Sequence, residues 1–442
     1  MKVEAPRIVT ELPGPRAKAL LKREKALISP SLTPQVPVVW DRAEGALVYD
    51  IDGNLFIDFT SGVLVTNTGH CHPRVAKAIA EQAKRLLNCY DFSHPTRVRL
   101  LEKLREILPK GLERVLFLTT GSEATDASIK IARRYTGRHE IVSFHGAFHG
   151  RTYAAMTVGG KIGVKKGYGP LLPGVIQAPY PYCYRCPFNL KYPECGLLCV
   201  DYLDWVLRCQ STGDTAAVIV EPYEGAAGCL IPPKEFLPRL RRFCDDHGFL
   251  LIVDEVQSSF GRTGKMFAVQ HYDVTPDILY AAKGLASGVP TAMVAAKEAV
   301  MNALEPGSMS STYGGNPLSC AAAIASIDVI LEEKLIERAA EIGSYVIGKL
   351  GEIKEKRRYL GDVRGLGLAI GIELVKDKRT KVPAPEDTQR FVNEAYKKGL
   401  ILIAPLGHFN NVVRVVPPLT INRELVDKGL DIIDDTLKLL EN

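Results

Sequence analysis

From Val115 to about Ala295 the sequence alternates short apolar runs with longer helical stretches. The apolar runs are VLFL (115–118), EIVSF (140–144), AVIVE (217–221), LLIVD (250–254), ILYAA (278–282) and TAMVAA (291–296). Continuous apolar strands separated by helices are typical of a parallel sheet that is covered on both faces. The pattern therefore predicts an α/β fold, in which ligand-binding groups gather at the carboxyl ends of the strands.

The chain has 442 residues, which exceeds the size at which one compact core stops growing. We therefore expect a large domain over residues 61–330 and a small domain over 331–442. Residues 1–60 are expected to contribute to the small domain, because they read as a Pro-rich segment followed by a hairpin (ALVYDIDGNLFIDF). The hairpin is predicted to turn at Asp52-Gly53-Asn54.

Charge and composition exclude several classes of protein. The 56 basic and 50 acidic residues are interspersed, and the net charge of +6 forms no basic stripe, so we expect no nucleic-acid partner. No run approaches 18 apolar residues, and the first 25 residues lack the apolar core of a signal peptide. A cytoplasmic protein without membrane contact is the resulting prediction.

Lys283 is the first residue that points to chemistry. It is the only charged residue in the nineteen from Ile278 to Ala296. An ammonium in apolar surroundings is destabilised, so its pKa falls and the neutral amine becomes a nucleophile toward carbonyls. A lysine at a strand end can equally extend its ammonium to water, so Lys283 alone leaves both interpretations open.

Two further features point to a ligand at the same edge of the sheet. Asp254 ends the buried run LLIVD, and a carboxylate there needs a metal or an organic cation as a partner. Gly121 and Ser122 lie between a strand and a helix, where backbone N–H groups and the helix dipole can bind a phosphate. An ordinary helix cap explains the second feature equally well. Neither a P-loop nor a dinucleotide-binding glycine pattern is present.

Taken together, the three features call for one ligand with an aldehyde, a basic ring nitrogen and a phosphate. Pyridoxal 5′-phosphate carries all three groups. Its aldehyde forms a Schiff base with a lysine, and its ring withdraws electrons when an aspartate keeps the nitrogen protonated. The sequence therefore predicts pyridoxal 5′-phosphate as the cofactor.

Several motifs resemble those of the class III (ω-type) aminotransferases, a pyridoxal-phosphate family that includes 4-aminobutyrate and ornithine aminotransferases. The motifs are GSEATDASIKIARRYTGR, FHGAFHGRTYAAMTV, EPYEGAAG, IVDEVQSSFGRTGKMFAVQHYDVTPDILYAAKGLASG, STYGGNPLSCAAA and NVVRVVPPLTI. They occur in the family's order from about residue 45 to the C-terminus. The resemblance implies fold type I of these enzymes, with a mostly parallel seven-stranded sheet in the large domain and a smaller α+β domain.

The resemblance also implies roles around the cofactor. Lys283 would form the Schiff base and move a proton between the substrate Cα and the cofactor. Asp254 would pair with the pyridinium nitrogen, and Gln257 would reach the ring hydroxyl. Val256 would pack against one face of the ring, and Phe148 would stack on the other face.

The remaining implied roles concern the phosphate and the substrate. Gly121 and Ser122 would hold the phosphate. Thr312 would reach the phosphate in the neighbouring subunit, which implies a homodimer with an active site that lies between domains and across the dimer interface. Arg414 would bind the substrate α-carboxylate, and Arg151 a distal carboxylate. Both arginines could instead pair with surface acids.

One motif departs from the family pattern. The family often reads EPxQGEGG, whereas this chain has EPYEGAAG. Glu221 therefore keeps the first acid, which we expect to contribute to substrate binding, and Ala226 replaces the second. In ω-aminotransferases that second acid covers the carboxylate-binding arginine while an ω-amine reacts. Without it, Arg414 stays open to α-carboxylates by that route, unless Glu224 takes over the covering.

These observations predict amino transfer from an amino acid to a 2-keto acid. The expected donor is an ω-amino acid such as 4-aminobutyrate or ornithine, and the expected acceptor is 2-oxoglutarate or pyruvate. Because Ala226 departs from the pattern, an amino-acid racemase or epimerase on the same fold is the alternative. A non-catalytic binding module is a further alternative, but such a module would be expected to lose Lys283 or Asp254.

A cluster of four cysteines is the second departure. Residues 183–199 read CYRCPFNLKYPECGLLC and contain Cys183, Cys186, Cys195 and Cys199. We expect this segment, called the excursion below, to lie on the surface between two catalytic strands. We predict no metal here, although the four thiols could build a zinc site with loose spacing. Disulfides or reduced buried thiols are the other interpretations.

Overall fold

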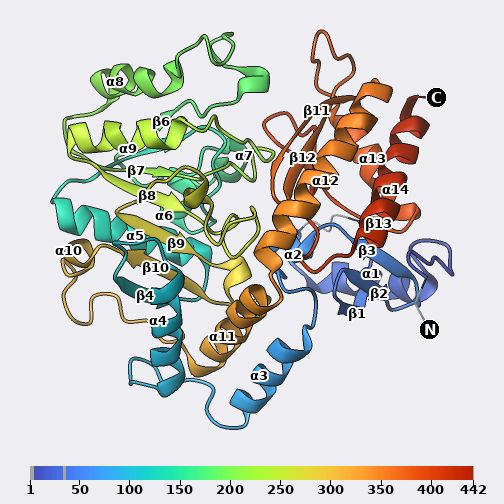
Figure 1. Cartoon of the computed structure of the whole chain (residues 1–442), viewed down its shortest axis with the longest axis horizontal. Coiled ribbons are helices and arrows are strands. Elements are labelled where there is room, and N and C mark those ends of the chain that lie inside the picture. The colour runs from blue at the N-terminus through green and yellow to red at the C-terminus, as the bar shows by residue number, and fades with distance from the viewer. Residues whose placement is uncertain (1–3, 33–35, 442) are drawn as a thin grey trace. The chain divides into compact units, whose positions relative to one another are not determined.

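The computed structural model of the protein describes residues 4–32 and 36–441. These residues form two compact units (Figure 1). The large unit is Arg74–Glu337, and the small unit consists of the chain on either side of it. Each helix and strand is described below with the unit that holds most of its residues.

The large unit is built on a seven-stranded sheet in the order β4-β10-β9-β8-β7-β5-β6. The strands are β4 (Arg114–Leu118), β5 (Glu140–Phe144), β6 (Val175–Ala178), β7 (Thr215–Val220), β8 (Leu250–Asp254), β9 (Ile278–Ala281) and β10 (Ala292–Ala296). Only β10 runs antiparallel to its neighbours, so the mostly parallel seven-stranded sheet predicted from the sequence is confirmed. Strands β5 and β7 to β10 are buried along their whole length, which explains their unbroken apolar sequences.

The large unit also contains helices, several of which contact the strands of this sheet (Figure 1). They are α3 (Pro73–Ala83), α4 (Pro95–Ile107), α5 (Gly121–Thr136), α6 (Tyr153–Val158), α7 (Ile162–Lys165), α8 (Leu198–Gln210), α9 (Phe236–His247), α10 (Glu298–Met301) and α11 (Pro317–Glu332). Three short 3-10 turns also occur, η1 (Cys183–Arg185), η2 (Ala268–His271) and η3 (Lys283–Leu285). Helix α5 contacts β7 to β10. It begins at Gly121, shortly after β4 ends at Leu118, so its first turn lies near the end of that strand.

The small unit holds two four-stranded sheets, in the orders β1-β2-β3-β13 and β11-β12-β15-β14. Their strands are β1 (Trp40–Glu44), β2 (Leu47–Asp50), β3 (Leu55–Asp58), β11 (Leu360–Leu366), β12 (Ala369–Leu374), β13 (Leu400–Ile401), β14 (Ile403–Leu406) and β15 (Val412–Val415). The helices are α1 (Pro15–Leu27), α2 (Ser61–Leu64), α12 (Leu335–Lys356), α13 (Pro385–Lys397) and α14 (Arg423–Glu441). The predicted hairpin is confirmed, because β2 and β3 pair antiparallel.

Helix α1 lies in the Pro-rich start of the chain, where the sequence pattern predicts no helix. Pro15 occupies the first helical turn, where the missing N–H of proline costs no hydrogen bond. Asp52 binds this turn, because its carboxylate accepts the N–H groups of Arg16 and Ala17 at 2.9 and 2.8 Å. Among the described residues, no helix is long and apolar enough to cross a membrane.

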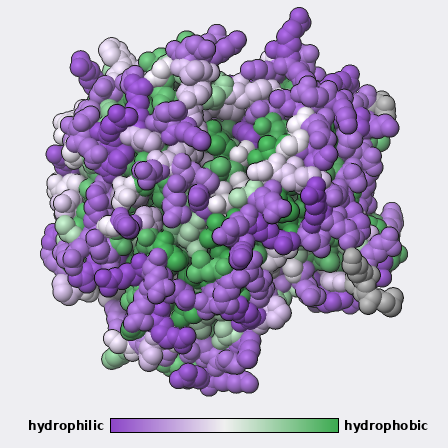
Figure 2. All heavy atoms as spheres, in the orientation of Figure 1, coloured by the Kyte–Doolittle hydropathy of each residue, from purple (hydrophilic) through white to green (hydrophobic). Residues whose placement is uncertain are grey.

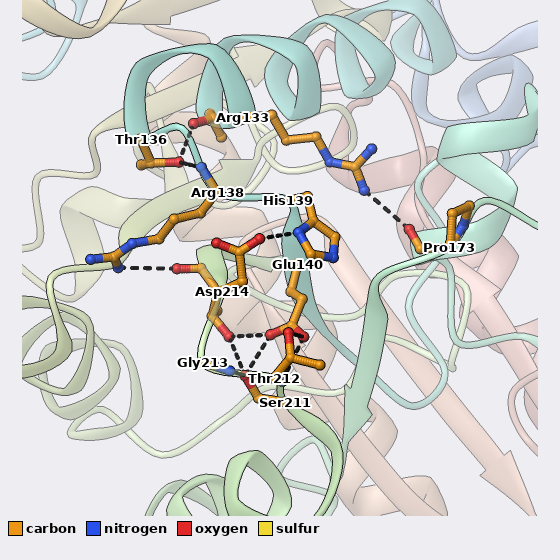
Figure 3. A network of polar contacts seen from close by, with 12 residues as sticks. Arg133, Thr136, Arg138, His139, Glu140, Pro173, Ser211, Thr212, Gly213 and Asp214 are labelled. Atoms are coloured by element: carbon orange, nitrogen blue, oxygen red, sulfur yellow. Dashed lines mark hydrogen bonds and ion pairs between the residues drawn. The ribbon is translucent and has the colours of Figure 1, made fainter.

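A buried carboxylate at the start of β5 binds the segment that leads into β7 (Figure 3). Glu140 is 3% exposed and accepts hydrogen bonds from the hydroxyls of Ser211 and Thr215 and from the N–H and hydroxyl of Thr212. Burial by itself would raise the pKa of Glu140, but these donors lower it to about 2. An ion pair between His139 and Asp214 borders the same network.

We expect Glu140→Gln to lower the free energy of unfolding by about 3 kcal/mol at pH 7, because the folded state binds the charged carboxylate. The depressed pKa makes this stabilisation complete above the ordinary glutamate pKa of 4.5. It is lost as the pH falls toward 2. Urea unfolding at pH 7 and pH 3 checks this difference, with the exposed Glu106→Gln on α4 as the matched control. An equal loss at both pH values would contradict the assignment.

Candidate active site

Asp254 is the last residue of β8, and its carboxylate is buried, with 4% of its surface exposed. One oxygen, Oδ1, accepts the N–H of Val256 at 2.8 Å. The other oxygen, Oδ2, accepts the hydroxyl of Tyr280 at 2.7 Å and lies 2.7 Å from Nδ1 of His149. Three polar partners therefore compensate for the removal of this carboxylate from water.

Tyr280 and His149 are functional residues that the sequence reasoning missed. Tyr280 lies on β9 directly beside Asp254 in the parallel register. Burial and the charge of Asp254 raise the pKa of the Tyr280 hydroxyl well above its ordinary value, so this group stays a donor. Nε2 of His149 is buried and has no hydrogen-bond partner among the described residues. The sequence did contain a signal for each residue. His149 directly follows the predicted Phe148 in GAFHG, and Tyr280 is the one polar group within the apolar run ILYAA.

A second buried carboxylate follows β7 at the same edge of the sheet. Glu221 accepts the N–H of Phe148 at 2.8 Å and the N–H of Gly225 at 3.0 Å. Burial and the negative charge of Asp254 raise the pKa of Glu221 to about 7. Its protonation state is thus sensitive to pH in the neutral range, and it ties the 148 and 225 segments together.

Glu224 is the carboxyl that replaces the glutamine of the family motif. Its side chain is completely buried, and neither carboxyl oxygen has a hydrogen-bond partner among the described residues. Burial and the charge of Glu221 raise its pKa well above the ordinary value. Because an unpaired buried carboxylate is costly, the neutral acid is the favoured form of Glu224.

The first turn of α5 forms a cradle for an anion. Thr120 caps the helix in a capping box with Glu123, which leaves the first-turn N–H groups of Gly121 and Ser122 without acceptors inside the helix. A Cβ at Gly121 would lie 3.1 Å from the side chain of Val256. The close approach of Gly121 to Val256 therefore leaves no room for a larger residue.

A neighbouring loop closes on the same turn. Gly150 has a φ of +141°, and a Cβ there would lie 2.1 Å from Oγ of Ser122. Oγ of Ser122 accepts the N–H of Arg151 at 3.0 Å. The loop that carries Phe148 and His149 is thus held against the start of α5, and glycine is required at position 150.

Lys283 follows β9 at the edge where Asp254 ends β8, because the two strands are parallel neighbours. Its side chain is half-buried, and its backbone has a φ of +23°. Strained backbone of this kind at a non-glycine residue is concentrated at functional sites. The structure therefore brings Lys283 to the edge of the sheet that also carries Asp254 and Glu221.

Three further predicted residues lie near this edge of the sheet, namely Val256, Gln257 and Arg151. Val256 and Gln257 directly follow β8, and a Cβ at Gly225 would meet the Gln257 carboxamide at 2.3 Å, so these residues belong to the same site. Arg151 is exposed, with its guanidinium 5.2 Å from the ring centre of Phe148.

The roles of two further predicted residues, Thr312 and Arg414, rest on the family resemblance. Thr312 is exposed on the loop before α11. Arg414 lies on β15 of the small unit and is 4% exposed. Their predicted roles at the phosphate and at the substrate carboxylate therefore stay predictions.

The donor set fits pyridoxal 5′-phosphate. A buried carboxylate suits a protonated ring nitrogen, the first turn of α5 suits a phosphate, and a lysine stands at the same edge for the aldehyde. The close Gly121–Val256 and Gly150–Ser122 approaches hold the segment after β8 and the 148–151 loop against this turn.

Comparison with known proteins identifies the family. The family model for class III aminotransferases matches residues 28–437. An alanine/serine racemase of Pyrococcus horikoshii is 39% identical over 99% of this chain and 93% of that protein. A 4-aminobutyrate aminotransferase of Mycobacterium leprae is 38% identical over 97% of both. The crystal structure of ornithine aminotransferase from Toxoplasma gondii superposes with a TM-score of 0.84, at 30% identity and over 96% of both chains.

The chain therefore belongs to the class III aminotransferases. The predicted family, fold type I and dependence on pyridoxal phosphate are confirmed. The protein is an aminotransferase by family and by structural neighbours.

We expect Tyr280→Phe to lower the free energy of unfolding by about 2 kcal/mol, because Asp254 then loses a donor while it stays buried. Denaturant unfolding at pH 7 measures the effect, and Tyr135→Phe on α5, where the side chain is 45% exposed, serves as the control. Equal stability of the two variants would show that the Tyr280 hydroxyl does not support Asp254.

Proposed function

We propose that this chain transfers an amino group from an amino acid to a 2-keto acid, with the acid–base chemistry carried by Lys283 and Asp254. The observation that carries the proposal is the arrangement at the end of β8, where Asp254 is buried with three polar partners. The most specific donor supported by the relatives is an ω-amino acid such as 4-aminobutyrate or ornithine. The acceptor would be 2-oxoglutarate or pyruvate.

The chemistry divides between the cofactor and the chain. Pyridoxal 5′-phosphate, when bound, supplies an aldehyde that reacts with amines and a ring that withdraws electrons. The carboxylate of Asp254 holds a proton on the ring nitrogen, and Tyr280 and His149 hold that carboxylate in place. The Nζ amine of Lys283 would remove the proton from the substrate Cα and, for amino transfer, deliver it to the cofactor carbon that carried the aldehyde.

Other residues orient the reactants. Gly121 and Ser122 bind the phosphate through their N–H groups, and Phe148 and Val256 enclose the ring. Gln257 donates to the ring hydroxyl from the segment that follows β8. These groups fix the plane of the ring, so that the bond broken at Cα stays aligned with it.

The family resemblance supports roles for two arginines, and a hydrogen bond supports a role for Glu221. We assign the substrate α-carboxylate to Arg414 and a distal carboxylate to Arg151. Glu221 positions the Phe148 segment, because it accepts that residue's N–H at 2.8 Å. Removal of the guanidinium in Arg151→Ala should therefore weaken the use of dicarboxylate keto acids more than that of pyruvate.

We also propose a homodimer. The large unit exposes several large apolar side chains around α4 and on the loop before α11, namely Leu86, Leu87, Tyr90, Phe92 and Tyr313. Figure 2 shows apolar side chains gathered on the face that carries α4 and α11. A second copy of the chain would cover such residues, and Thr312 on the adjoining loop would then be able to reach the partner's phosphate. A cytoplasmic location stays a prediction.

Racemisation is the second candidate. It is favoured by Ala226, which removes the acid that covers the carboxylate-binding arginine in ω-aminotransferases, and by the similarity to an alanine/serine racemase. A racemase uses the same lysine and the same ring but returns the proton to the opposite face of Cα. Both reactions therefore share the roles given to Lys283 and Asp254.

A half-reaction separates the two functions. The purified protein, loaded with pyridoxal phosphate, is mixed with a panel of L-amino acids and ω-amines in the absence of a keto acid. We expect an ω-amine to convert the yellow form to the pyridoxamine form, as followed by absorbance. An unchanged spectrum together with accumulation of the D-isomer, detected by chiral chromatography, would establish racemisation instead.

We expect Lys283→Ala to lower turnover by at least about a thousandfold, because Lys283 is the base that we assign to the proton at Cα. Binding of pyridoxal phosphate should persist, since the phosphate cradle and Asp254 are unchanged. The exposed Lys234→Ala is the matched control. Activity of the Lys283 variant near that of the control would refute the assignment.

A further inference from the structure

The four cysteines of the sequence cluster come together in the structure. They lie in the segment that leaves the sheet after β6, passes through η1 and enters α8. Cys183, Cys186, Cys195 and Cys199 all line one small cavity. The volume open to the centre of a water molecule is only about 20 Å³, so the cavity has room for about one water molecule.

The remaining walls of this cavity are aromatic and aliphatic. Tyr180, Tyr182, Phe188 and Leu198 are among its lining residues. Cys183 is exposed to solvent, whereas the other three cysteines are partly buried, and all four are free thiols. Cys183 is therefore the most exposed of the four cysteines, and a small reagent in solution is expected to meet it first.

In the described parts of the chain, no three His, Cys, Asp or Glu side chains are placed to hold a metal ion together. The four thiols are thus neighbours without being arranged as a formed metal site.

The electrostatics show how closely the thiols influence one another. Burial raises the pKa of Cys183, and the charges of Cys195 and Cys186 raise it further, Cys195 more strongly. Burial, followed by the charges of Cys183 and Cys195, raises the pKa of Cys199 to about 12. The raised pKa values keep these thiols protonated near neutral pH, so any oxidation proceeds through the small fraction of Cys183 that is a thiolate, and this fraction grows as the pH rises.

We propose that Cys183 and Cys195 are a redox modification site that closes the excursion with a disulfide. Cys183 is the accessible partner at η1, and Cys195 lies on the far arm of the excursion, before α8. The bond would join the two arms of the segment, which removes conformational freedom from the unfolded chain. The inference does not depend on the catalytic function.

The oxidant is a low-molecular-weight disulfide such as oxidised glutathione. The thiolate of Cys183 attacks one sulfur of the oxidant, forming a mixed disulfide and releasing one small thiolate. The thiolate of Cys195 then attacks the sulfur of Cys183, forming the internal disulfide and releasing the second small thiolate. Two protein thiols are oxidised, one small disulfide is reduced, and the two cysteine protons pass to the released thiolates.

Tryptic mapping without reductant tests the pairing. The pyridoxal-phosphate-loaded protein is incubated with oxidised or reduced glutathione, alkylated and digested. Cleavage after Arg185 and Lys191 places Cys183 and Cys186 in separate peptides and Cys195 with Cys199 in a third. We expect the Cys183 peptide to be linked to the third peptide, with a mass lower by two hydrogen atoms than that of the free pair.

Variants assign the partner and provide the control. Cys183→Ser and Cys195→Ser should abolish the linked peptide, whereas Cys199→Ser and the exposed Cys209→Ser on α8 should retain it. The raised pKa of Cys183 should make the rate of linkage rise by about tenfold for each pH unit near neutrality. The oxidised wild-type protein should also unfold several degrees higher than the reduced one, and Cys195→Ser should not show this shift.

Three results would overturn the proposal. The first is the absence of any linked peptide after oxidation, and the second is linkage of Cys186 in place of Cys183. The third is zinc at one ion per chain in the purified protein, with thiols that react only after chelation, since this would assign the cluster to a metal. None of these readouts involves catalytic activity.

Discussion

The large unit depends on one buried carboxylate, that of Asp254 at the end of β8. A negative charge removed from water must be compensated, and here a backbone N–H, a tyrosine hydroxyl and a histidine nitrogen compensate for it. Those groups come from the segment after β8, from β9 and from the loop after β5. The charge thereby fixes the mutual positions of three segments that are far apart in the sequence, and it leaves a site that attracts a ring cation.

The carboxylates around this charge set the character of the site. Glu221 and Glu224 follow β7, and their raised pKa values arise from burial and from neighbouring negative charge. In this motif Glu224 is wholly buried, and Ala226 stands where the family often has a second acid. The departure at Ala226 is the reason why racemisation is carried as the second proposed activity.

The sequence predicted those features that depend on local pattern. Lys283 and Asp254 were recognisable because each is a charge at the end of an apolar strand, and the sheet followed from the continuous apolar runs. Tyr280 and His149 were missed because a single polar residue in a buried segment can be satisfied by many partners. The strand register brings Tyr280 to Asp254, and the loop after β5 brings His149 to it. The Glu140 network joins residues 71 or more positions apart, so no local pattern reveals it.

The central claim is that Asp254 is shaped to hold a protonated ring nitrogen. The most direct measurement compares the affinity of the wild-type chain for pyridoxal 5′-phosphate with its affinity for the 1-deaza analogue, in which carbon replaces that nitrogen. The cofactor and the analogue are expected to make the same interactions with Lys283 and with the phosphate cradle. The ratio of their two dissociation constants therefore reports on the interaction with Asp254 alone. The account predicts at least about tenfold weaker binding of the analogue, because a hydrogen bond to a charged group is lost. Equal affinities would contradict it.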